Sequence, residues 1–168
     1  ADNRDGVRTL GADLEFRYAY KSWLSASSSW TYQYLQNMQK YEEGYTQVSP
    51  VYKDQMPNIP YLFGNLGINL HFPKSAGNNN RLTAGYNLQY VHDFYLYWPS
   101  RGATKNTIPK QLSHDLSLVY SMHDGRYNLG LEARNLTNER LYDNFSMQKP
   151  GRAFYLNFRY FIRKINHN

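Results

Sequence analysis

The chain has 168 residues and a net charge of +6, and its mean hydropathy of -0.75 leaves no apolar run long enough for a membrane-spanning helix. Its 19 Lys and Arg residues are scattered and form no dense basic cluster, which argues against nucleic-acid binding. Yet 17% of the residues are aromatic, including 17 Tyr. A β-barrel with aromatic side chains at the lipid interface and polar side chains toward a wet lumen has this composition.

Alternation of apolar and polar residues predicts seven strands, because side chains of a strand point to opposite faces in turn. The strands are expected at residues 7–20, 24–36, 61–72, 81 to about 96, 111–122, 127–136 and 153–162. Short connections near 21, 73–80 and 123–126 alternate with long ones at 37–58, 95–109 and 137–150. Outer-membrane barrels alternate short periplasmic turns with long extracellular loops, so this pattern predicts an end of the sheet that lies outside the cell.

The apolar faces of the seven strands contain no Lys, Arg, Asp or Glu, and only His92 and His114 are ionisable there. An Arg or Lys on a lipid-facing strand surface costs about 2–4 kcal/mol at the bilayer midplane, which explains the absence. Lipid-facing positions are expected at Leu66, Ile68, Tyr86, Leu88, Leu116, Leu118, Leu131 and Phe158, and lumen-facing ones at Asn69, Asn87, Ser117, Glu132 and Arg159. A soluble all-β sandwich with Tyr-rich sheets is the structural alternative.

A distinctive series of short motifs lies near the end of the chain. Ala133-Arg134-Asn135-Leu136-Thr137-Asn138 is followed by Leu141-Tyr142-Asp143, by Lys149-Pro150-Gly151-Arg152, and by the alternating run from Ala153 to Ile162. These motifs, in this order, resemble the C-terminal end of TonB-dependent outer-membrane receptors, where an Asn-Leu-Thr-Asn strand exit, a Tyr-Asp loop and a Pro-Gly-Arg lead into the last barrel strand. The strand rhythm extends the resemblance more loosely over the whole chain.

The resemblance implies an all-β, antiparallel transmembrane β-barrel, with residues 1–168 supplying about seven C-terminal strands of a larger barrel of about 22 strands. It implies a multi-pass receptor of the Gram-negative outer membrane that imports a scarce nutrient, using energy delivered through TonB. Family substrates include ferric siderophores, haem, cobalamin and glycans. The implied partners are this nutrient, the TonB complex, membrane lipid and lipopolysaccharide, and the remainder of the same receptor chain, with no cofactor and no nucleic acid.

The plug domain and the TonB-contacting segment of the family are expected upstream of this chain, as is an export signal, since Ala1 to Asp5 are polar. Seven strands leave two edges open, so the chain is expected to be incomplete as a folding unit and to close with strands elsewhere in the parent receptor. The family usually ends on an aromatic residue, whereas here Phe161 is followed by seven further residues. A passive porin or adhesin barrel is the functional alternative, and a plug preceding Ala1 would distinguish the receptor from it.

No pattern in the sequence indicates catalysis or a metal site. The five histidines are dispersed without the spacing of metal ligands: His71, His92, His114, His123 and His167. The chain has many Asp, Ser and His residues, but no spacing singles out three of them as a catalytic triad. No enzyme activity is therefore expected. Inside the barrel, Glu132 or Arg134 is expected to pair with Arg159 or with a plug domain.

The long loops combine aromatic and cationic side chains, a mixture that suits an anionic chelate with an aromatic or apolar body. The candidate ligand-binding residues are Tyr95, Tyr97, Trp98, Arg101, Tyr142, Met147 and Lys149. Neither the second nor the third long loop contains His, which favours an anionic ferric chelate over His-ligated haem, although Tyr also ligates haem iron. The alternative role for each of these residues is an anchor at the membrane interface.

Overall fold

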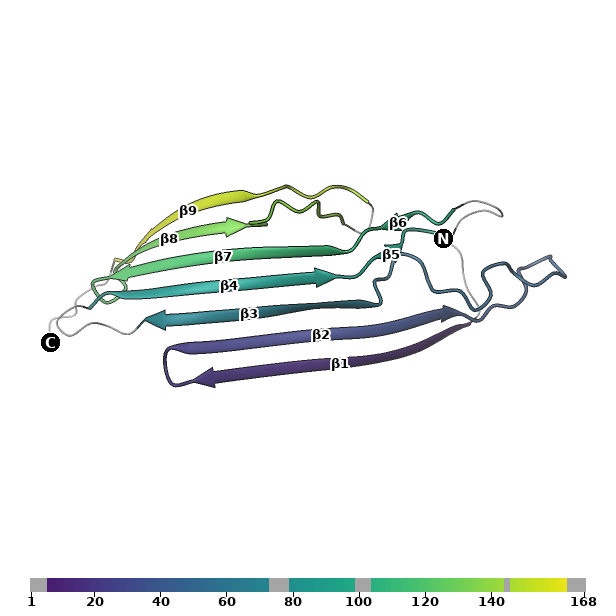
Figure 1. Cartoon of the computed structure of the whole chain (residues 1–168), viewed down its shortest axis with the longest axis horizontal. Coiled ribbons are helices and arrows are strands. Elements are labelled where there is room, and N and C mark those ends of the chain that lie inside the picture. The colour runs from purple at the N-terminus through teal and green to yellow at the C-terminus, as the bar shows by residue number, and fades with distance from the viewer. Residues whose placement is uncertain (1–5, 73–78, 99–103, 144–145, 163–168) are drawn as a thin grey trace.

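The computed structural model describes residues 6–72, 79–98, 104–143 and 146–162, and these residues form β-strands and loops. The strands are β1 (Val7–Tyr20), β2 (Leu24–Asn37), β3 (Leu62–Phe72), β4 (Arg81–Val91), β5 (Phe94–Tyr95), β6 (Thr107–Ile108), β7 (Gln111–Met122), β8 (Tyr127–Arg134) and β9 (Ala153–Tyr160). Seven of them form one antiparallel sheet in the order β1-β2-β3-β4-β7-β8-β9 (Figure 1). The remaining two, β5 and β6, form a small separate ladder.

The seven predicted strands are confirmed, with small changes at their ends. The largest difference is in the fourth, which ends at Val91, well before residue 96. The His92 amide still donates to the carbonyl of Leu62, the next position in the β3–β4 register, after which Phe94 and Tyr95 pair with Ile108 and Thr107. Part of the predicted second loop is therefore a short antiparallel ladder, separate from the main sheet.

Register places the predicted lipid-facing and lumen-facing residues on opposite faces. Ile68 lies opposite Tyr86, which lies opposite Leu116, and the same face continues through Leu118, Leu131 and Phe158. The other face carries Asn69, Asn87, Ser117, Glu132 and Arg159. The two faces are named here the apolar face and the polar face.

Little of the apolar face is covered by the rest of the chain. Within the described residues the buried hydrophobic side chains are Val51, Phe94 and Ile108, all in the loops beyond the sheet. Large apolar side chains of the strands are exposed, among them Leu14, Phe16, Leu118, Leu131, Phe154, Leu156 and Phe158. The soluble sandwich is thus not the architecture of the described residues, among which no second sheet packs on this face. No helix of the described residues has the length and apolarity needed to cross a membrane.

Both edges of the seven-stranded sheet are open within the described residues, with β1 at one edge and β9 at the other. The long loops lie together at one end of the strands, and the short turns lie at the opposite end (Figure 1). These ends are called the loop end and the turn end.

Candidate functional site at the loop end

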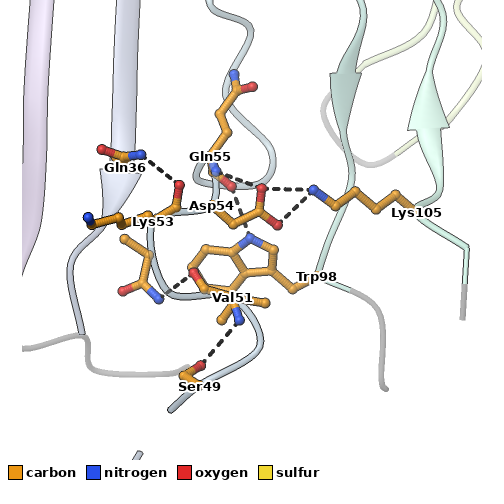
Figure 2. Close-up of polar contacts among 9 residues, drawn as sticks. Gln36, Ser49, Val51, Lys53, Asp54, Gln55, Trp98 and Lys105 are labelled. Carbon is orange, nitrogen blue, oxygen red and sulfur yellow. Dashed lines mark hydrogen bonds and ion pairs between the residues drawn. The ribbon is translucent and has the colours of Figure 1, made fainter. Parts of the chain in front are cut away.

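The first and second long loops are locked together at the loop end (Figure 2). Asn37, the last residue of β2, is fully buried, and its side-chain amide donates to the carbonyl of Val51 at 3.0 Å. Its backbone amide donates to the carbonyl of Asp54, and its carbonyl accepts from Lys53. One asparagine therefore folds the first loop back onto the end of its own strand.

The second loop contributes a small apolar core and forms two hydrogen bonds with the first loop. Phe94 is 3% exposed and Ile108 is 2% exposed, so the β5–β6 hairpin buries its apolar residues. The indole Nε1 of Trp98 donates to the carbonyl of Gln55 at 2.9 Å (Figure 2). The Asn58 amide donates to the carbonyl of Tyr95 at 2.5 Å. Both hydrogen bonds join the second loop to the first, with the donor in the second loop for Trp98 and in the first for Asn58.

Lys105 of the second loop forms an ion pair with Asp54 of the first loop. Its Nζ lies 2.8 Å from Oδ1 and 2.7 Å from Oδ2 of Asp54, and it also lies 4.2 Å from the centre of the Tyr95 ring. The two charged side chains are only 33% and 27% exposed. This cation is therefore already neutralised by a carboxylate, which weakens its value for an anionic ligand.

Beside these two loops lies an aromatic hollow of about 320 Å³. It is lined by Tyr32, Tyr34, Gln55, Tyr61, Asp93, Phe94 and Tyr95. The Tyr61 hydroxyl lies 3.0 Å from Nε2 of His92, whose Nδ1 lies 2.5 Å from the Asp93 carboxylate. That second contact does not have the geometry of a hydrogen bond. Burial, and then the charge of Asp93, raises the pKa of Tyr61.

The motif that precedes β9 has a structural explanation. Asn135 is 3% exposed, and its side-chain amide donates to the carbonyl of Glu139 while its Oδ1 accepts from the Glu139 amide. Asn138 accepts the backbone amide of Arg152 at 3.0 Å. A Cβ on Gly151 would lie 2.7 Å from Asn138 Oδ1, so glycine is required for this approach. Both asparagines have positive φ, a conformation that Asn tolerates better than most residues.

The predicted ligand-binding residues fall into two groups. Tyr95 and Trp98 are tied to the first loop, as described above. The amide of Tyr142 donates to Oε1 of Gln111 at the start of β7, and Tyr142 pairs with Gln148 across the third loop. Tyr97, Met147 and Lys149 are exposed. Arg101 lies outside the described residues.

Sequence reasoning missed the contribution of Asp54 and Gln55, which hold Lys105 and Trp98. The partners in the ion pair are 51 residues apart in the chain, and no periodic pattern connects them. Of the two partners expected for Glu132 or Arg134, Arg159 is not the one that the structure brings into contact. Arg134 Nε lies 2.6 Å from Oε1 of Glu132 on the same strand, while Arg159 lies over the ring of Phe161. Among the described residues no cluster of three or more His, Cys, Asp or Glu is arranged to hold a metal ion.

No protein-family model matches the sequence, and no curated protein matches it. Among solved structures, the chain is similar to the siderophore receptor PiuA from Acinetobacter baumannii, with a TM-score of 0.70 and 18% sequence identity. The match covers 92% of this chain and 22% of that one, so the chain spans about a fifth of the length of the receptor structure it matches. The likeness agrees with the sequence resemblance at the level of the fold. The chain therefore has the fold of part of a TonB-dependent receptor barrel.

Proposed function

We propose that residues 1–168 form part of the wall of an outer-membrane receptor that captures a scarce nutrient at its loop end and imports it by TonB-dependent transport. The observation that carries the proposal is the contrast between the two faces of a single sheet. One face is apolar, uncharged and uncovered, and the other is polar and lined with Asn, Ser and charged side chains. A lipid bilayer covers the first kind of face, and a water-filled lumen suits the second.

Aromatic side chains gather at both ends of the apolar face, as expected at two membrane interfaces. At the loop end, Trp30 contacts Tyr90 and Tyr61 contacts His92, with ring centres 6.0 and 4.6 Å apart. At the turn end, Tyr20 contacts Trp23 at 5.7 Å and Tyr127 stacks on Tyr160 at 5.1 Å. The face thus has an aromatic belt at each end.

The spacing between the belts fits a bilayer. On β4 the loop-end belt includes Tyr90, and near the turn end Leu82 lies opposite Tyr120, a further aromatic residue of the apolar face. Residues 82 to 90 span about 27 Å at about 3.4 Å per residue. With the strands tilted by about 40° this becomes about 21 Å, close to the apolar band of about 25 Å in outer-membrane barrels.

The open edges support membership of a larger barrel. Unpaired backbone groups at a sheet edge cost several kcal/mol each in hydrocarbon, so β1 and β9 need partner strands in a membrane. We assign these partners to the remainder of the parent receptor, whose plug and TonB-contacting segment lie outside residues 1–168.

The ligand site that we propose lies on the loops, and its function is binding and transport without catalysis. Tyr97, Met147 and Lys149 offer exposed aromatic, apolar and cationic groups, and Tyr95, Trp98, Arg101 and Tyr142 complete the proposed set. The locked first and second loops hold Tyr95 and Trp98 in place, which lowers the entropy lost on binding. We favour an anionic ferric chelate as the ligand, with haem as the second candidate because Tyr ligates haem iron.

The test is ligand binding by the parent receptor in liposomes, with ferric hydroxamate and ferric catecholate chelates as ligands. Trp98→Ala combined with Arg101→Ala should weaken binding by about tenfold or more, which corresponds to about 1.4 kcal/mol. Tyr97→Ala is the companion variant, because the Tyr97 side chain is exposed and its loss spares the ties between the loops.

The matched control combines Trp23→Ala with Arg81→Ala, the same residue types at the turn end. It should leave binding unchanged. Binding unaffected by both loop variants would remove these loops from the ligand site, and passive diffusion of small solutes without TonB would identify the protein as a porin.

A further inference from the structure

The turn end of the sheet holds a cationic site that the proposed transport function does not use. Arg126, in the turn between β7 and β8, donates from Nη2 to the hydroxyl of Tyr160 at 2.8 Å. Its guanidinium carbon lies 5.4 Å from the centre of the Tyr160 ring and 5.8 Å from that of Tyr127. Two stacked tyrosines of the apolar face thus hold one exposed arginine at the boundary of that face.

The rest of this cluster is also built on ring contacts. Tyr127 and Tyr160 lie opposite each other across β8 and β9, with ring planes inclined by 24°. His123, at the other side of the turn, meets the Tyr127 ring edge-on at 5.6 Å. The amide of Phe161 donates to the Arg126 carbonyl, which fixes the turn against the end of β9. The position of Arg126 is therefore set by groups from both β8 and β9.

Within the described residues, Arg126 has no carboxylate partner. The neighbouring Asp124 accepts instead from the side-chain amide of Asn79 at 2.8 Å. A guanidinium has five N–H donors in a planar fork that matches a phosphate, and Tyr160 engages only one of its nitrogens. Arg126 thus keeps donors available for an anion outside the protein.

Charge at the turn end favours an anion more broadly. The described cations in the turns of this end are Lys21 and Arg126, and Asp124 is the carboxylate there, whereas Arg81 and Arg159 lie on the polar face. Lys21 repeats the arrangement of Arg126, because its Nζ lies 5.3 Å from the centre of the Tyr20 ring, which in turn contacts Trp23. At the loop end, by contrast, cations alternate with carboxylates such as Glu42, Asp54 and Asp93.

We propose that Arg126, held by Tyr127 and Tyr160, binds the phosphate of an anionic phospholipid in the leaflet at the turn end. The inference rests on the proposed placement of the apolar face in a membrane. The acyl chains then lie along the exposed Phe158 and Leu156 of β9, in line with the ring pair, while the headgroup meets the guanidinium. A guanidinium is suited to this role because it binds phosphate and stacks on aromatic rings at once.

The experiment uses the full receptor in nanodiscs of equal phosphatidylglycerol and phosphatidylcholine, with retained lipids counted by native mass spectrometry. Arg126→Gln should lower the retained ratio of phosphatidylglycerol to phosphatidylcholine about fivefold, from about 1 kcal/mol per basic residue at an anionic surface. Tyr160→Phe keeps the ring but removes the hydroxyl, and should give a smaller loss. Heat-dependent gel mobility verifies that each variant is folded.

Arg81→Gln is the matched control, because Arg81 lies at the same end but on the polar face. It should leave the ratio unchanged. An equal fall for Arg81→Gln and Arg126→Gln, or no fall for Arg126→Gln, would overturn the phospholipid site while leaving the membrane placement intact. A folded wild-type receptor that retains neither lipid and stays outside the bilayer would instead overturn the proposed function itself.

Discussion

The two faces of the seven-stranded sheet treat their polar groups in different ways. On the apolar face, polar side chains satisfy each other: Trp30 Nε1 donates to Ser28 Oγ at 2.7 Å, and the Tyr86 hydroxyl lies 2.8 Å from His114 Nδ1. On the polar face, Glu132 and Arg134 form a pair that is open to solvent, with 30% and 58% of their side chains exposed. Polar side chains on the apolar face have partners within the protein, whereas on the polar face water can take the place of a partner.

On the proposed placement in a membrane, the difference teaches that each face, rather than each strand, is suited to one solvent. Lipid offers no hydrogen-bond partners, so a polar side chain there must find one in the protein. Water in a lumen offers partners everywhere. Averaged along a strand the two faces cancel, which is why a chain with this surface has a mean hydropathy of only -0.75.

The largest effect is expected from a charge placed on the apolar face. Leu116→Arg should lower the free energy of unfolding of the parent receptor in lipid vesicles by about 2–4 kcal/mol, because Leu116 lies opposite Tyr86, midway between the two aromatic belts, where the guanidinium enters hydrocarbon. Urea titration measures the change. Ser117→Arg, one residue away on the polar face, is the matched control and should cost far less. Equal losses would mean that both faces meet the same solvent.

The second largest loss of stability is expected from a substitution at Gly64, which lies against the ring of Trp30. A Cβ on Gly64 would lie 2.6 Å from atoms of the Trp30 ring and from the carbonyl of Ser29, so Gly64→Ala must displace the indole. We expect a loss of about 1–3 kcal/mol from overpacking, together with a shift in tryptophan emission. Gly130→Ala is the control, because a Cβ there would meet its nearest neighbour at an ordinary 3.6 Å. An unchanged emission for Gly64→Ala would contradict this packing.

A smaller effect is expected from the polar pair of the apolar face. Tyr86→Phe leaves Nδ1 of His114 without its partner and should cost about 1 kcal/mol, the scale of hydrogen bonds between side chains in membranes. His114→Leu combined with Tyr86→Phe should recover much of that loss, since no polar group is then left unpaired. A double-mutant cycle of unfolding free energies measures the coupling. Strictly additive losses would show that the pair is not coupled in the membrane.

The smallest effect is expected from the corresponding pair on the polar face. Glu132→Gln removes the carboxylate that faces Arg134, but water can solvate the exposed guanidinium. The midpoint of unfolding should stay within experimental error of the wild type. A loss as large as that of Tyr86→Phe would mean that this part of the polar face is dry.

The strands and their faces were predictable because apolar and polar residues alternate along the sequence with a period of two. Positions such as Leu116 and Ser117 are neighbours in the chain and separate to opposite faces by geometry alone. The ends of the long strands followed from Gly, Pro and Asn in the connections. The two-residue strands β5 and β6 were not predictable, because each is too short to show a period of two and they lie at opposite ends of a connection without alternation.

The candidate site was less accessible to sequence reasoning. Aromatic and cationic loop residues were recognised from composition, but the Asp54–Lys105 ion pair and the Trp98–Gln55 hydrogen bond join distant parts of the chain. The asparagine motif before β9 predicted a strand exit. That Asn138 accepts the Arg152 amide beside Gly151 became visible only in three dimensions.

The most direct test of the two-face account is thiol labelling of adjacent residues of β7 in the membrane-embedded receptor. Residues 1–168 contain no cysteine, so Leu118→Cys and Ser117→Cys each introduce a single thiol into this part of the receptor. The account predicts that a water-soluble maleimide labels Ser117→Cys at least about tenfold faster, whereas a lipid-partitioning maleimide reverses the order, since alternate residues of a barrel strand face lumen and lipid. Equal labelling of both positions by both reagents would contradict it and would indicate a sheet with water on both faces.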